Sequence, residues 1–131
     1  MSLIFLTIAL GIVSGISEGM VMHFPNIREH PDFYLYHGID VLAYALMAWV
    51  AVKLWQARQR SWRYLLMVIG LAFLLWECRE IGYNAARYNT AFAPYEHVFG
   101  LGIYISGSAA LALHWCRLFI AVLALLIGGV R

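Results

Sequence analysis

The sequence predicts an all-α integral membrane protein, a four-transmembrane-helix bundle with an apolar C-terminal extension. The 131 residues are 63% hydrophobic and 12% charged, and their mean hydropathy is +0.75. The apolar residues form long runs, and a helix of about 20 such residues crosses a bilayer. We therefore expect one membrane domain over residues 1–131, with spans at about 2–22, 34–55, 62–83 and 97–117.

The first span, residues 2–22, carries glycines at every fourth position: Gly11, Gly15 and Gly19. This spacing lets another helix approach closely. Glu18 flanks the same strip and is expected to face protein rather than lipid. The strip therefore predicts either a packed helix or an interface with a partner protein or a second copy of the chain.

The second span, about residues 34–55, follows a loop that contains two prolines. His37, Asp40 and Tyr44 are spaced i, i+3 and i+7 in its first two turns, so they share one helix face. A histidine or an acid at a helix start is common. The three residues together predict a polar face near one end of the bundle.

The connection between the second and third spans is basic, with Lys53, Arg58, Arg60 and Arg63. Positive charge gathers on the cytoplasmic side of membrane proteins. The sequence therefore predicts that both termini are cytoplasmic, that the two proline-containing loops face outward, and that the membrane is a bacterial inner membrane.

The third span, about residues 62–83, ends with Glu77 and Glu80 around Arg79. Residues three apart lie on neighbouring parts of one helix face, so we expect the two carboxylates to point together into the bundle and Arg79 to point elsewhere. The fourth span is expected to begin beside His97 and to end near residue 117. Residues 118–131 would then extend that helix, lie in the membrane interface or dock a partner.

With this topology, acids and histidines from all four helices lie near the outer end of the bundle. The carboxylates within the spans would cost on the order of 10 kcal/mol if they were charged and unpaired. Carboxylate and imidazole ligands on facing helices resemble the arrangement of di-iron carboxylate bundles, although the Glu-x-x-His motif of that class is absent. We predict a metal site, with one or two ions of iron, manganese or zinc, whose ligands are Glu18, His37, Asp40, Glu77, Glu80 and His97.

Three functional hypotheses follow from this cluster. The first is a metal-dependent membrane oxidoreductase or hydrolase that acts on a small or lipidic substrate. The second is a non-catalytic accessory subunit of a larger membrane complex, in which the buried charges form structural ion pairs such as Glu80 with Arg79. The third is a proton or cation pathway. The sequence has no basic patch of the kind that nucleic acid requires.

Overall fold

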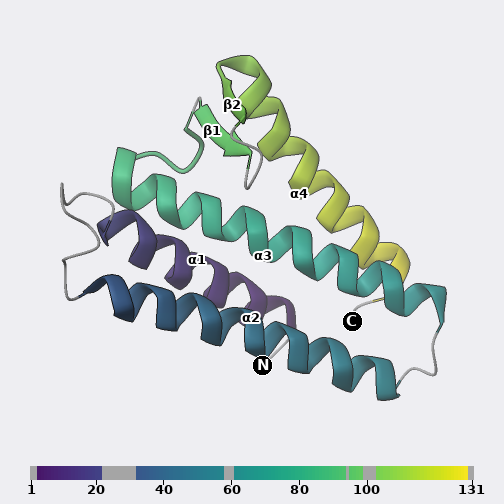
Figure 1. The fold of residues 1–131 in the computed structure, drawn as a ribbon. Coiled ribbons are helices and arrows are strands. Elements are labelled where there is room, and N and C mark those ends of the chain that lie inside the picture. Colours follow the sequence, from purple (N-terminus) through teal and green to yellow (C-terminus); the bar gives the residue numbers. More distant parts are fainter. Residues whose placement is uncertain (1–2, 22–31, 58–60, 94, 99–102, 130–131) are drawn as a thin grey trace.

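The computed structural model describes residues 3–21, 32–57, 61–93, 95–98 and 103–129. Over these residues the chain forms long helices and one short β-hairpin (Figure 1). In chain order the elements are α1 (Leu3–Val21), α2 (Asp32–Ala57), α3 (Trp62–Tyr88), β1 (Tyr95–Val98), β2 (Ile103–Ser106) and α4 (Ser108–Gly128). The predicted helical class is confirmed.

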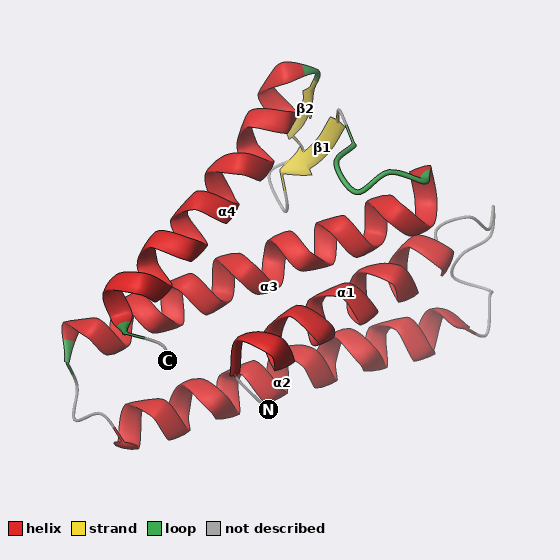
Figure 2. Cartoon of the chain, turned by 180° about the vertical axis from the view of Figure 1, so that it is seen from behind, coloured by secondary structure: helices red, strands yellow, loops and turns green. Residues whose placement is uncertain are grey.

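The helix α3 lies at the centre of the molecule. It packs closely against α1 on one side and against α4 on the other, whereas α2 packs on α1 and meets α3 mainly through long side chains, as where the Tyr64 hydroxyl donates a hydrogen bond to the carbonyl oxygen of Ala51. Figure 2 shows the same order from behind, with α4 meeting the first half of α3 and diverging from it towards the hairpin. Because both sides of α3 are covered, polar groups on opposite faces of this helix can both be buried.

Close packing of α1 on α3 depends on glycines. A β-carbon at Gly15 would collide with the carbonyl oxygen of Arg79, and one at Gly82 would lie 2.5 Å from the carbonyl oxygen of Ile12. Gly11 and Gly19 face α3 in the same way. The glycine strip therefore serves a contact within the chain, and this corrects the prediction of an interface with a partner or a second copy there.

The boundaries of the first three predicted helices agree with the structure to within a few residues, except that α3 continues to Tyr88 and is not among the helices apolar enough to cross a membrane. It ends at Asn89, which adopts the left-handed conformation (φ 54°) that Asn tolerates at a helix C-terminus. Asn84 is buried within the last turns of α3. The charged residues from Glu77 to Glu80 therefore lie within α3 and inside the fold rather than at the end of the helix.

The prediction for the fourth helix is wrong at its boundaries. Residues 95–98 and 103–106 pair as antiparallel strands, from Tyr95 opposite Ser106 to Val98 opposite Ile103, and α4 begins only at Ser108. The strands contain aromatic and β-branched residues, and Gly100 and Gly102 stand between them in the sequence. The predicted C-terminal extension, residues 118–131, is therefore the second half of α4 as far as Gly128.

Within the described residues, three helices are long and apolar enough to cross a membrane: Leu3–Met20 in α1, Gly38–Gln56 in α2 and Ser108–Gly128 in α4. Their outward faces expose large apolar side chains, as at Trp49 in α2 and Phe119 in α4. The charged helix α3 lies between them. The apolar helices thus lie around a charged helix, an arrangement that is compatible with contact with a lipid bilayer.

Candidate functional site

The centre of the site is Arg79, whose guanidinium is shared by three carboxylates. Its Nη2 atom lies 2.5 Å from Oε2 of Glu18 in α1 and 3.5 Å from Oδ2 of Asp40 in α2, and its Nη1 atom lies 3.6 Å from Oε1 of Glu80. We call these four residues the Arg79 cluster. It joins three helices through one cation.

The Arg79 cluster is largely but not completely buried. The side chains of its four members are between 11% and 16% exposed. The hydroxyl of Ser14 in α1 donates a hydrogen bond to Oδ1 of Asp40. The cluster is therefore partly accessible, while its contacts hold its geometry.

A second charged group lies on the opposite side of α3. Oε1 of Glu77 lies 2.7 Å from Nδ1 of His114 and its Oε2 lies 2.7 Å from Nε of Arg117, both in α4. We call these three residues the Glu77 cluster. Glu77 and His114 are fully buried and Arg117 is 2% exposed. This cluster cross-links α3 to α4 without access to solvent.

His114 meets both other members of the cluster through one ring nitrogen. Its Nδ1 lies 2.7 Å from Oε1 of Glu77 and 3.0 Å from Nη2 of Arg117. The Arg117 guanidinium also lies 4.9 Å from the centre of the Trp76 ring, and Phe92 packs edge-on against the His114 ring. Aromatic rings therefore enclose the cluster.

Helix geometry explains why the charges of α3 divide into two groups. At 3.6 residues per turn, positions 77 and 79 are about 160° apart around the axis. Glu77 faces α4 together with Met67 and Gly70, and Arg79 faces α1. The expectation that Glu77 and Glu80 point together while Arg79 points elsewhere is therefore wrong. Glu80 instead lies beside Arg79 and contacts its guanidinium.

The predicted ligand residues do not all gather at one place. Glu18, Asp40 and Glu80 lie around Arg79, and Glu77 lies on the opposite face of α3. His37 lies one turn before Asp40 in α2, and His97 lies in β1; the side chains of both histidines are outside the described residues. Among the side chains that are described, no group of three His, Cys, Asp or Glu residues is placed to hold a metal ion.

Sequence reasoning missed His114 and Arg117 as partners of Glu77. It placed them near the cytoplasmic end of the fourth span, because that span was assigned 11 residues too early. The sequence did contain a signal for these two partners of Glu77. Two ionisable residues three apart in an otherwise apolar helix lie on one face, and such residues in membrane helices generally face a partner.

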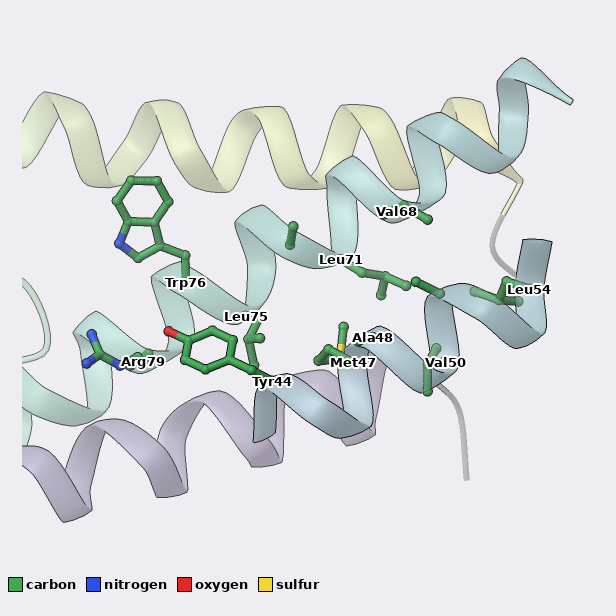
Figure 3. Close-up of a pocket in the computed structure, with 12 residues that line it drawn as sticks. Tyr44, Met47, Ala48, Val50, Leu54, Val68, Leu71, Leu75, Trp76 and Arg79 are labelled. Carbon is green, nitrogen blue, oxygen red and sulfur yellow. The ribbon is translucent and has the colours of Figure 1, made fainter. Parts of the chain in front are cut away.

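A cavity of about 510 Å³ opens between α2 and α3, next to the Arg79 cluster (Figure 3). We call it the α2–α3 cavity. Its walls are mainly aliphatic, and Tyr44, Trp76 and Arg79 gather at one end of it. The backbones of α2 and α3 are close at only a few points, which leaves room for the cavity between them. Arg79 therefore belongs both to the cavity wall and to the charged cluster.

Comparisons with known proteins give no guide to this site. No protein-family model matches the sequence, and no curated protein or solved structure matches it either.

Proposed function

We propose that the chain is an integral membrane protein that binds a small amphipathic or lipidic molecule in the α2–α3 cavity, with the polar end of that molecule beside the Arg79 cluster. One observation carries this proposal: Arg79 lines the cavity and is also the cation that three carboxylates share. An apolar cavity with a few polar groups at one end is the usual form of a small-molecule site.

The size and position of the cavity support a ligand that enters from the bilayer. Cavities that hold small molecules are usually about 300–1,000 Å³, and this one is about 510 Å³. Its walls include Met47 and Leu54 from α2 and Val68 and Leu71 from α3. Since the cavity is partly open and lined by apolar residues of two helices, we propose that an apolar molecule enters it directly from the bilayer.

The apolar helices support a location in the membrane. We place the α2–α3 connection and both termini in the cytoplasm, because four basic residues lie in or beside that connection. In Figure 1, the start of α1 and the end of α4 lie towards the same end of the molecule as that connection. A bacterial inner membrane fits this orientation, with the Arg79 cluster nearer the outer side.

A pair of matched variants tests the proposal. Ala48 lines the cavity, whereas Ala45 is exposed on the same helix and does not line it. We expect Ala48→Trp to abolish binding of lipidic molecules that copurify with the protein, and Ala45→Trp to leave it unchanged, as measured by native mass spectrometry from detergent. Equal binding by both variants would exclude the cavity as the site.

Metal binding is the second candidate, because three predicted ligands converge on one point. Arg79 occupies the position among Glu18, Asp40 and Glu80 that a metal ion would need, and this favours the ligand-binding proposal. Elemental analysis of the purified protein decides between them. A metal enzyme would contain stoichiometric iron, manganese or zinc, would lose it in Glu80→Ala, and would melt at a lower temperature in chelator, because an ion that binds only the folded state stabilises it.

The two other hypotheses give different results in the same experiments. An accessory subunit would lack both metal and cavity ligand and would depend on its ion pairs for stability. A proton or cation pathway would need polar groups through the cytoplasmic half of the bundle, where the cavity walls are aliphatic. The cavity next to Arg79 therefore makes ligand binding the better supported function.

A further inference from the structure

The polar end of the α2–α3 cavity presents hydrogen-bond donors. Tyr44 contributes a hydroxyl, Trp76 an indole N–H and Arg79 a guanidinium, and Figure 3 shows the three side chains at the same end of the cavity, with the Trp76 ring turned towards α4. Tyr44 is 54% exposed and Trp76 is 37% exposed, so both are accessible to a ligand. A head group that accepts hydrogen bonds fits this end.

The charges around this end discriminate against ionised head groups. A carboxylate or phosphate on the ligand would bring a fourth negative charge to Arg79, beside Glu18, Asp40 and Glu80. An ammonium group has no lone pair and cannot accept a hydrogen bond from the donors that line this end of the cavity. Like charges repel strongly where water is scarce. An uncharged acceptor adds no charge beside Arg79 and still accepts hydrogen bonds from the donors at this end of the cavity.

The rest of the cavity fits an apolar tail. Its lining on α2 runs from Tyr44 to Leu54, ten residues along the helix, which is about 15 Å at 1.5 Å per residue. Opposite this stretch, α3 presents Val68, Leu71 and Leu75. The ring of Trp76 is held by the Arg117 guanidinium on its face, so this donor does not depend on the ligand for its position.

We propose that the α2–α3 cavity binds an uncharged amphipathic molecule whose carbonyl head accepts hydrogen bonds from Tyr44, Trp76 and Arg79 and whose apolar tail lies along α2. This inference rests on the proposed function and specifies the ligand class. A membrane quinone and the ester carbonyl of a neutral lipid share this head-group chemistry.

The experiment measures binding of four probes to the full-length protein in nanodiscs, with empty nanodiscs to correct for partitioning. The probes are a decyl benzoquinone, dodecanoic acid methyl ester, dodecanoic acid and dodecylamine. We expect one or both neutral probes to bind at least tenfold more tightly than the acid and the amine. Preference for the quinone or for the ester identifies which source of the carbonyl the cavity accepts.

Substitutions at the donors complete the test. Tyr44→Phe and Trp76→Phe should each weaken the neutral probe by about three- to tenfold, the worth of one hydrogen bond. Tyr34→Phe, on the same helix but outside the cavity lining, should have no effect. Tighter binding of the acid or the amine, or unchanged affinity in Tyr44→Phe and Trp76→Phe, would overturn the head-group assignment and leave cavity binding intact. Failure of all four probes, with binding no better than in Ala48→Trp, would overturn the proposed function itself.

Discussion

Loss of Arg117 should destabilise the protein more than loss of any exposed arginine. In Arg117→Met a side chain of similar length stays in place, but the buried carboxylate of Glu77 loses the cation 2.7 Å from its Oε2. Glu77 is fully buried, so water does not replace that cation. Breaking a buried ion pair by removing one partner typically costs about 3–5 kcal/mol. The expected loss corresponds to a change of about two to three and a half orders of magnitude in the unfolding equilibrium.

The assay is reversible denaturation in mixed detergent micelles, read as the free energy of unfolding. Arg63→Met is the control, because Arg63 is exposed on α3, and it should change the free energy by no more than about 0.5 kcal/mol. The double variant Glu77→Gln with Arg117→Met should recover at least about 2 kcal/mol, since it removes the orphaned charge. Additive effects in this cycle would refute the assignment of Glu77 and Arg117 as a coupled pair.

Two further predictions concern packing and topology. Gly15→Ala should cost about 1–3 kcal/mol by forcing α1 away from α3, whereas Gly38→Ala, with nothing within 4 Å of the added carbon, should stabilise α2 by up to about 1 kcal/mol; thermal melting in detergent separates the two. In a background without native cysteines, a cysteine at Asn89 should react with an impermeant reagent in intact cells and one at Gln59 should not. Labelling at Gln59 from outside would reverse the orientation.

Periodicity and composition were sufficient to predict the first three helices, because each is a long apolar run that begins or ends at a clear signal. The fourth was displaced because Tyr95, His97, Ile103 and Ile105 are apolar or amphipathic enough to read as the start of a span. Hydropathy does not distinguish a short hairpin from the first turns of a helix. Only the pairing of the two strands fixes the start of α4 at Ser108.

Some residues of the candidate site were predictable from the sequence, but the contacts between them were harder to predict. Of the acids expected to gather, Glu18, Asp40 and Glu80 lie around Arg79, whereas Glu77 lies on the opposite face of α3. Which carboxylate contacts which cation depends on which helix packs against each side of α3. A single sequence does not show how the helices are arranged around α3. The displacement of α4 also concealed the pairing of Glu77 with His114.

The two charged clusters differ in burial, and this difference assigns their roles. The Glu77 cluster is sealed between α3 and α4, so its contribution is to fix the crossing of these helices and, through Arg117, the position of the Trp76 ring. The Arg79 cluster is more exposed and adjoins the cavity. Because Trp76 lines that cavity and Arg117 lies on its ring, the sealed cluster would position a donor of the proposed binding site. The glycine strip supports the same site from the other side, since only glycine lets α1 bring Glu18 to Arg79 while its backbone touches α3.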